Sequence, residues 1–562
     1  MTTRGKTLKL IIPVAEVVII ASLLISFVFV FVHAKGEGDV FDISKGWDVF
    51  IDGTEYENVD TSTFIYPREI GNVHEIDMYY RLSEDMRYGT TLRVYTRLSY
   101  VEVNLGEELL YYSGIEEQNP DGFVGMGYHF IQIPNKADSD MIHIRVIAVE
   151  KNALSGLPRV SLSSSNVAYT YFVDENAIGI FISSFIFILG AVLTLISVLY
   201  TYLNLDYFRL FLVGSFAFCV GLWSLCSQKA LQLFNISLSA NSSMEYLLLE
   251  VSFLPLLGYD LMVRENRTKN EKLAIRILLL ITLIYNIVAA CLHFTDIIHY
   301  SQFILVFYVI ALVDCIGMLF IGVKAEKHMS RSEKTFHYAL CVMGLYGFWR
   351  VIDYVYGHFL VRGNARVADN LFPVVLLFFV ISMLISYLFH LYDMVLSQAQ
   401  EEALTALAYK DSLTGLYNRT MSDEIFEQLN EKEQANYLFI DFDLNGLKKT
   451  NDEQGHVKGD LLISGFAKVL EETFSAYGKN MRMGGDEFLT IIEAKELPAV
   501  DILMQTYEEN CERISEETGV AISASYGIAY SSEVYEPEAE QIFRLADERM
   551  YEMKRKSKRA RG

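Results

Sequence analysis

Eight long apolar stretches constrain the fold of this chain more than any other feature of its sequence. An α-helix rises about 1.5 Å per residue, so roughly 20 apolar residues are needed to cross the hydrocarbon core of a bilayer. The stretches lie at about 10–34, 177–202, 208–226, 243–263, 273–292, 303–323, 336–357 and 371–391. Hydrophobic residues make up 52% of the 562 residues and charged residues 21%, which argues against a disordered chain and an ordinary soluble enzyme. We therefore predict a multidomain membrane protein.

The first stretch follows three basic residues, Arg4, Lys6 and Lys9, and it ends in Val32-His33-Ala34, which would serve as a poor cleavage site. A basic start followed by an apolar segment is typical of export signals. Residues 1–34 are therefore predicted to be a signal anchor or a cleaved signal peptide, and both alternatives stay open.

Basic residues in the connections predict which side of the membrane each loop faces. One connection carries Arg264, Arg267, Lys269 and Lys272, and another carries Lys324, Lys327, Arg331 and Lys334, whereas the loop 293–302 has no Lys or Arg. The two basic loops are expected in the cytoplasm. Seven crossings then leave residues 35–175 outside a bacterial inner membrane and everything beyond about residue 392 in the cytoplasm.

The exported interval alternates apolar and polar residues at 92–98, 101–105 and 142–148, which predicts half-buried β-strands. We expect an antiparallel β-sandwich that acts as an extracytoplasmic sensor domain at 35–175. Its many tyrosines either pack the sandwich or stack on an external ligand, which the sequence does not identify.

Among the charged residues of the predicted spans, Arg350 and Asp353 lie one helical turn apart, and Glu250 and Asp314 lie well within other spans. An ionised group is expensive inside a bilayer unless it faces a partner or the interior of the bundle. Two interpretations stay open: these residues relay a signal, or Arg350 simply pairs with Asp353 or Glu250.

Beyond the last span, residues 392–410 continue as a predicted helix with Leu396, Ala399, Ala403 and Ala406 at spacings of three and four. This pattern favours a signalling helix that pairs in parallel with a second copy, with an unpaired rigid connector as the alternative. Residues 411–562 are expected to form an α/β domain with a ferredoxin-like sheet that carries its helices on one face.

Acidic residues gather at two strand ends of this domain. An apolar strand ends in Asp441-Phe442-Asp443-Leu444, and the glycine pair Gly484-Gly485, which permits a tight hairpin or a phosphate at close range, leads into Asp486-Glu487. Asp443 and Asp486 side by side would form the oxygen-rich pocket that Mg²⁺ prefers. The pattern predicts phosphoryl or nucleotidyl transfer, although a Gly-Gly-Asp-Glu sequence alone is also compatible with a charged hairpin.

Four motifs in order resemble the GGDEF family of diguanylate cyclases. They lie at 411–419, 443–452, 455–460 and 484–488, within about 150 residues. The resemblance implies a cyclase palm-like fold in which a homodimer joins two GTP molecules into cyclic di-GMP and pyrophosphate. The formal charge of −23 disfavours nucleic acid as a partner.

The resemblance also implies roles for individual residues. Asp443, Asp486 and the carbonyl of Leu444 would hold Mg²⁺, for which Mn²⁺ could substitute. Asn451 and Asp460 would read the guanine, Glu487 would help to deprotonate the attacking 3′-hydroxyl, and Lys448, Lys554 and Lys558 would contact phosphates. Gly484 and Gly485 would let substrate approach the backbone.

Two positions depart from the family pattern. Many members carry an Arg-x-x-Asp product-inhibition site, but the matching positions here are Ser475 and Gly478, so feedback at that site should be absent. Ser557 and Lys558 stand where members often have Gly followed by Arg or Lys.

The layout of the membrane half resembles bacterial seven-transmembrane receptors with diverse intracellular signalling modules. The predicted domains are residues 1–34, the sensor 35–175, the seven-helix bundle 176–391, the signalling helix 392–410 and the catalytic domain 411–562. Together they predict a membrane-bound diguanylate cyclase that responds to an external signal. The alternatives are a catalytically silent nucleotide-binding sensor and a regulated transporter.

Overall fold

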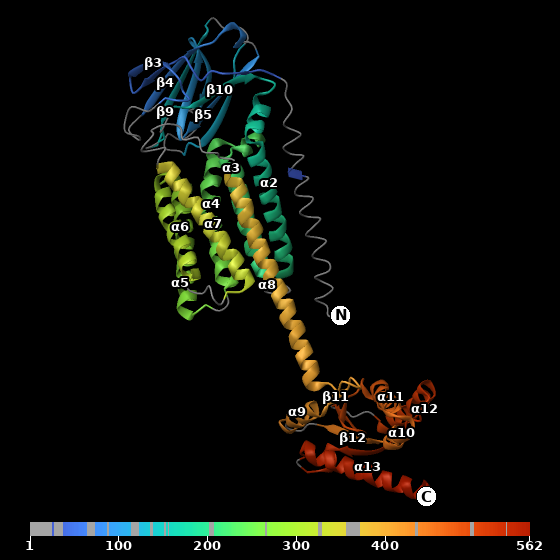
Figure 1. Ribbon diagram of the computed structural model, residues 1–562. Helices are drawn as coiled ribbons and strands as arrows, with labels where there is room; N and C mark the ends of the chain where they lie inside the picture. Colours follow the sequence, from blue (N-terminus) through green and yellow to red (C-terminus); the bar gives the residue numbers. More distant parts are fainter. Residues whose placement is uncertain are drawn as a thin grey trace. The chain divides into compact units, whose positions relative to one another are not determined.

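The structure is a computed structural model of the chain, and Figure 1 shows its helices and strands. It divides into two compact units, Met1–Tyr392 and Asp393–Gly562. The described residues are 25–26, 38–64, 74–86, 89–113, 123–134, 139–150, 153–154, 157–201, 207–264, 267–323, 329–355, 371–432, 436–494, 499–535 and 537–561. The first predicted span, 10–34, therefore lies outside the described part of the chain apart from residues 25 and 26.

The first unit begins with two antiparallel sheets. The strands are β1 (Val40–Phe41), β2 (Trp47–Ile51), β3 (Thr54–Val59), β4 (Glu75–Arg81), β5 (Thr90–Arg97), β6 (Ser99–Leu105), β7 (Glu108–Ser113), β8 (Met126–Gln132), β9 (Met141–Ala148) and β10 (Arg159–Ser164). One sheet has the order β3-β2-β4-β9-β6-β7 and the other β1-β10-β5-β8. Strands β5, β6 and β9 cover the three segments in which the sequence alternates.

The two sheets share one apolar core. Ile76 and Ile144 of the six-stranded sheet and Leu92 and Leu162 of the four-stranded sheet are fully buried in the same cluster. Along β9 the buried residues alternate with partly exposed ones, because successive side chains of a strand point to opposite faces. The alternation in the sequence therefore marks the faces that meet in this core.

Seven long helices follow among the described residues. They are α2 (Ala168–Thr201), α3 (Phe208–Ser227), α4 (Leu238–Val263), α5 (Lys269–Phe294), α6 (Tyr300–Val323), α7 (Arg331–Val355) and α8 (Leu371–Tyr409). In the described part of the chain, six of them are long and apolar enough to cross a membrane: α2, α3, α4, α5, α6 and α8. Helix α7 was predicted as a span at 336–357, but it is not one of the six. It carries Arg331, Glu333 and Lys334 at its start and Arg350 and Asp353 near its end.

The β-strands contact the helices through polar groups. The backbone N–H of Met126 in β8 donates to the hydroxyl of Ser242 in α4 at 2.8 Å. Arg93 of β5, which is almost fully buried, pairs with Glu175 of α2 at 2.7 Å. A displacement within the sheets therefore has direct contacts through which it can reach the helices.

Two residues of the first basic loop lie in a buried ion cluster. Arg267 Nη2 lies 2.5 Å from Asp260 Oδ2 and Arg264 Nε lies 3.5 Å from Asp260 Oδ1, and all three side chains are buried. Burying a charge is expensive unless an opposite charge faces it. These arginines, which we interpreted as loop charges, therefore also compensate Asp260 at the end of α4.

Glu250 and Asp314, the two acidic residues predicted deep within spans, each accept a hydrogen bond from a hydroxyl group. The Tyr285 hydroxyl donates to Glu250 at 3.2 Å, and the Thr282 hydroxyl donates to Asp314 at 2.8 Å. The predicted pairing of Arg350 with Asp353 is not tested, because the side chain of Asp353 lies outside the described part of the chain.

The second unit is built on a five-stranded sheet with the order β11-β13-β14-β12-β15. Its elements are β11 (Tyr417–Asn418), α9 (Arg419–Asn430), β12 (Tyr437–Leu444), α10 (Leu447–Gln454), α11 (His456–Phe474), β13 (Lys479–Gly484), β14 (Glu487–Glu493), α12 (Val500–Thr518), β15 (Ala524–Tyr530) and α13 (Ala539–Arg561). Strand β11 is parallel to β13, and the other pairs are antiparallel.

Helices cover both faces of this sheet, so the prediction of helices on one face was wrong. Helices α11 and α12 pack on the face that carries Ile440 and Phe442, and α9 and α13 pack on the face that carries Phe439. Every residue of β12 is buried. A strand without an exposed face must have a layer on each side, which explains why residues 437–440 are apolar at every position before the acidic residues Asp441 and Asp443.

Candidate functional site

The two predicted acidic motifs meet where β12 ends. Strands β12 and β14 are antiparallel neighbours, and their register places Asp443 directly opposite Glu487. The backbone N–H of Leu444 donates to the carbonyl of Asp486 at 2.8 Å. The structure therefore brings Asp443, Leu444, Asp486 and Glu487 together at one edge of the sheet, as the sequence predicted for a shared site.

Asp443 has one carboxylate oxygen that lacks a partner. Its Oδ1 atom is buried without a hydrogen bond, while its Oδ2 atom lies 2.5 Å from the ammonium of Lys554 in α13. An unsatisfied buried acceptor costs about 1–3 kcal/mol. A hard divalent cation would satisfy this oxygen, since such ions bind carboxylate and carbonyl oxygens.

The predicted metal ligands are two side chains, Asp443 and Asp486, and the carbonyl of Leu444. Among the described residues, no cluster of three or more His, Cys, Asp or Glu side chains could hold a metal ion. Two carboxylates and a backbone carbonyl would leave coordination positions for oxygens of a substrate, which is how nucleotide-bound Mg²⁺ is usually held.

Asp441 lies two residues earlier on the same strand and is buried between the neighbouring strands, opposite Leu489 and Gly527. Burial raises the pKa of Asp441 to about 8, and the carboxylates of Asp547, Glu487 and Asp443 contribute to the shift. Its surroundings favour a neutral side chain.

The glycine pair forms the tight turn between β13 and β14. Gly485 has φ +54° and Gly484 has φ +154°, values that residues with a side chain rarely adopt. Arg482 donates from Nη2 and Nε to the carbonyl of Gly485 at 2.8 and 3.1 Å. Its Nη1 atom lies 3.2 Å from Asp411 Oδ1. Arg482 therefore ties the turn to the first residue of the domain motif.

Asp411 is also fixed by its own turn. It accepts hydrogen bonds from the backbone N–H and the hydroxyl of Thr414 at 2.9 and 2.7 Å. Burial by itself would raise the pKa of Asp411, but the hydrogen bonds from Thr414 and the nearby Arg482 hold it below its usual value. Since α8 ends at Tyr409, this anionic anchor connects the end of that helix to the turn that carries Asp486.

Asn451 and Asp460 lie on two consecutive helices, α10 and α11, separated by Gly455 with φ +83°. A β-carbon built on Gly459 would lie 1.9 Å from Oδ1 of Asn451. The missing side chain at 459 is therefore what lets the Asn451 amide lie against α11, while Asp460 is exposed beside it.

If Asn451 reads the guanine, as the resemblance implies, Gly459→Ala should weaken GTP binding without unfolding the domain. Alanine favours a helix over glycine by up to about 1 kcal/mol, but its methyl group would displace the Asn451 amide. Loss of one guanine hydrogen bond should raise the KM for GTP about tenfold. Steady-state kinetics and thermal melting test this, with Gly465→Ala as the control within the same helix. An unchanged KM in Gly459→Ala would contradict the role given to Asn451.

The three lysines that the resemblance assigns to phosphate contacts lie at different places in the second unit. Lys448 is exposed at the start of α10, and Lys554 contacts Asp443. Lys558 lies four residues later in α13, but its side chain is outside the described set. No role was predicted from the sequence for Arg482, Asp411 or Gly459, although Asp411 and Gly459 lie within the motifs at 411–419 and 455–460.

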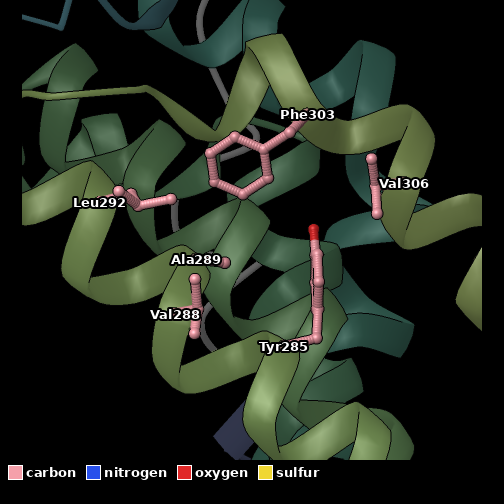
Figure 2. Close-up of a pocket in the computed structure, with 6 residues that line it drawn as sticks. All are labelled: Tyr285, Val288, Ala289, Leu292, Phe303 and Val306. Atoms are coloured by element: carbon pink, nitrogen blue, oxygen red, sulfur yellow. The ribbon is translucent and has the colours of Figure 1, made fainter.

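A cavity of about 180 Å³ lies elsewhere, between α5 and α6. Figure 2 shows its six lining residues, which are Tyr285, Val288, Ala289, Leu292, Phe303 and Val306. The lining contains no charged side chain and none of the predicted site residues. It therefore offers packing for an apolar group.

Comparison with known proteins matches the second unit. Residues 408–560 match the family model described as "Diguanylate cyclase, GGDEF domain". The chain is 30% identical over 170 residues to the diguanylate cyclase DgcS of Shewanella oneidensis, a match that covers 28% of this chain and 54% of that protein. It is 37% identical over 142 residues to the bifunctional diguanylate cyclase/cyclic di-GMP phosphodiesterase MucR of Pseudomonas aeruginosa, covering 24% of this chain and 20% of that protein.

Among solved structures, the coiled coil and GGDEF domain of DgcB from Caulobacter crescentus, in complex with c-di-GMP, is 23% identical, with a TM-score of 0.26. That match covers 30% of this chain and 91% of the other. The chain thus spans about half the length of the first curated relative and a smaller share of MucR.

Proposed function

Residues 408–560 of this chain are a GGDEF domain, and from that premise we propose that the protein is a membrane-bound diguanylate cyclase controlled by an external signal. It would join two GTP molecules into cyclic di-GMP and release pyrophosphate. The observation that carries the proposal is the meeting of Asp443, Leu444, Asp486 and Glu487 at one sheet edge, with one oxygen of Asp443 unsatisfied.

Asp443, Asp486 and the carbonyl of Leu444 would hold Mg²⁺, with Mn²⁺ as a substitute. A bound divalent cation neutralises charge that develops on phosphate oxygens and holds them in position. Lys554 now pairs with Asp443. A cation held by that carboxylate would leave Lys554 available to contact a phosphate. Lys448 and Lys558 would contact phosphates as well.

Asn451 and Asp460 would select guanine, because an amide and a carboxylate together match its hydrogen-bonding edge and would be left unpaired by adenine. Gly484 and Gly485 leave the backbone of the turn open, since no atom lies within 4 Å of a β-carbon built on either. This space suits the approach of a triphosphate.

Glu487 would accept the proton of the 3′-hydroxyl as it attacks the α-phosphate of the second GTP. It is exposed at the start of β14, so a substrate held by another copy can reach it. One GTP per domain means that two domains must face each other to close the ring. A homodimer is therefore part of the proposal.

The membrane half would place this site under external control. The six apolar helices support a multi-pass membrane protein. With α7 as a seventh crossing, the basic connections would place residues 35–175 outside the bacterial inner membrane, as an exported β-sandwich sensor, and the GGDEF domain in the cytoplasm. The contacts Met126–Ser242 and Arg93–Glu175 are routes by which an unidentified ligand would influence the helices. We propose the same domain boundaries that the sequence predicts.

The purified full-length chain, incubated with GTP and Mg²⁺, tests this function. We expect cyclic di-GMP and pyrophosphate by liquid chromatography, and no cyclic product from ATP. GTP binding without turnover in a protein shown to be dimeric would instead support a catalytically silent nucleotide-binding sensor. Equal consumption of ATP would contradict the guanine-reading role of Asn451 and Asp460.

Cyclic di-GMP should not inhibit the enzyme through an Arg-x-x-Asp site, because the matching positions are Ser475 and Gly478. A β-carbon at Gly478 would lie 2.3 Å from the backbone carbonyl of Ile491, so an aspartate at this position would require the strand to move. Ser475, at the end of α11, offers no guanidinium. Initial rates measured with added cyclic di-GMP should stay constant. A steep fall at micromolar product would overturn this expectation.

A further inference from the structure

The peptide group between Leu444 and Asn445 is held from both sides of β12. The backbone N–H of Leu444 donates to the carbonyl of Asp486 on one side. The backbone N–H of Asn445 donates to the carbonyl of Ser523 on the other side, at 2.8 Å. A trans peptide group points its carbonyl away from its own N–H. The carbonyl of Leu444 therefore points away from Ser523, toward the side of the sheet where Asp486 lies.

Strand β12 ends immediately after this peptide group. The last pair in its register with β15 is Leu444 and Ala524, and Gly446, with φ +80°, is already the N-cap of α10. The ladder of strand hydrogen bonds therefore no longer orients the chain at Asn445. Because φ and ψ are soft dihedrals, other contacts have to keep the Leu444 carbonyl at a fixed angle.

The side chain of Asn445 makes contacts of this kind. Its Nδ2 atom donates to the hydroxyl of Ser523 at 3.4 Å, and its Oδ1 atom accepts from the hydroxyl of Ser525 at 3.3 Å. Both bonds are long, but they act together with the backbone bond to Ser523. Ser525 is 1% exposed and lies directly opposite Asp443 in the register of β12 and β15. Asn445 is thus fixed by a residue that borders the first predicted metal ligand.

Packing of the domain does not account for these contacts. Asn445 is half-buried and Ser523 is exposed, so the bond between them adds little to the core. A hydrogen bond of this type contributes only about 0.5–1.5 kcal/mol to stability. What distinguishes the contacts of Asn445 is their place, since they act on the same peptide group that carries the Leu444 carbonyl.

We propose that Asn445 is a positioning residue of the metal site, which holds the carbonyl of Leu444 at the angle that a divalent cation needs. Contacts that orient the ligands of a metal site typically contribute about 10- to 100-fold to metal affinity. The inference rests on the proposed function, because it takes Asp443, Asp486 and the Leu444 carbonyl as the ligands. It adds a residue that lies outside this ligand set.

Loss of this support should affect different cations unequally. Mg²⁺ demands a nearly ideal octahedral geometry, whereas Ca²⁺ accepts flexible arrangements of about six to eight oxygens. If Asn445 fixes the angle of one ligand, its loss should weaken the binding of Mg²⁺ more than that of Ca²⁺. A residue that only stabilised the fold would change the affinity for both cations alike.

Binding of Mn²⁺ alone to the purified full-length chain tests the proposal. The loss of the free-ion signal in electron paramagnetic resonance measures binding without nucleotide and without turnover, and Asp443→Asn measures the Mn²⁺ that binds elsewhere on the chain. Asn445→Ala should bind Mn²⁺ roughly tenfold more weakly than the unmodified chain. In competition with Mn²⁺, the affinity for Mg²⁺ should fall by a similar factor and that for Ca²⁺ by less than about threefold.

Asn430→Ala is the matched control. Asn430 also joins two elements through both ends of its amide, because it accepts from the backbone N–H of Ala539 and donates to Glu540. These contacts lie at the start of α13, about four turns before Lys554, which contacts Asp443. The control variant should therefore bind Mn²⁺ as the unmodified chain does.

A second variant removes the same contacts from the opposite side. Ser523→Ala/Ser525→Ala leaves Asn445 in place but takes away both hydroxyls that its amide contacts. It should reproduce the loss of Mg²⁺ affinity. The test therefore does not depend on whether Asn445→Ala folds.

Three outcomes would overturn the proposal and leave the proposed function standing. They are an unchanged Mn²⁺ affinity in Asn445→Ala or in the double serine variant, an equal loss for Mg²⁺ and Ca²⁺, and a loss in Asn430→Ala as large as that in Asn445→Ala. Failure of the proposed metal site itself would look different, because the unmodified chain would then bind no more Mn²⁺ than Asp443→Asn, and the inference would fall with it.

Discussion

Asp443→Asn should reduce cyclic di-GMP synthesis by about 10³-fold while the domain stays folded. The substitution keeps the size of the side chain but removes the negative charge that a divalent cation needs. Oδ1 of Asp443 is buried without a hydrogen bond and Oδ2 pairs with Lys554. The carboxylate therefore has one oxygen that a cation could bind at the end of β12. Synthesis rates over a range of Mg²⁺ concentrations, with circular dichroism for folding, measure the effect.

Asp441→Asn is the matched control for this prediction. Both residues are buried on the same strand, two positions apart, but Asp441 lies between the neighbouring strands rather than beside Asp486. Burial favours a neutral side chain, so the amide should be tolerated with activity close to that of the unmodified chain. Full activity in Asp443→Asn, or an equal loss in both variants, would contradict the assignment of Asp443 as the metal ligand.

Glu487→Gln should lower turnover by about 10²- to 10³-fold and leave GTP binding largely intact. Glutamine cannot accept the proton of the 3′-hydroxyl, although it fits the same place at the start of β14. Since Glu487 lies opposite Asp443 rather than near Asn451, guanine contacts should persist. Turnover and equilibrium GTP binding, measured on the same protein, separate the two effects.

Glu493→Gln provides the control for charge on the same strand. Glu493 lies at the other end of β14, where it pairs with Lys432 at 2.5 Å in an exposed position. Exposed ion pairs contribute at most about 1 kcal/mol to stability, so this variant should turn over normally. A Glu487→Gln variant that turns over as fast as Glu493→Gln would exclude Glu487 from catalysis.

The sequence predicted the strands of the catalytic domain well because local signals and tertiary contacts agree there. Strand β12 was predicted at the residues where it lies, since a run of apolar residues ends in charged ones. The glycine pair marked the turn because only glycine readily adopts its backbone angles. These features follow from the properties of neighbouring residues along the chain.

Other features depend on contacts that the sequence alone does not display. The apolar pattern predicts a helix over residues 461–474, but α11 begins at His456. Gly459 lies in its first turns and leaves room for Asn451. The bond of Arg482 to Asp411 joins residues 71 positions apart. Helices on the second face of the sheet became evident only when β12 was found buried on both sides.

The central claim is that two GTP molecules are joined at sites built around Asp443 and Glu487. The most direct test supplies the full-length protein with Mg²⁺ and an equal mixture of ordinary and isotopically labelled GTP, followed by mass spectrometry. We predict cyclic di-GMP with light, mixed and heavy species in a binomial distribution, and none from Asp443→Asn. Absence of a cyclic product, although GTP binds to a dimer confirmed by cross-linking, would contradict the account and support the binding sensor.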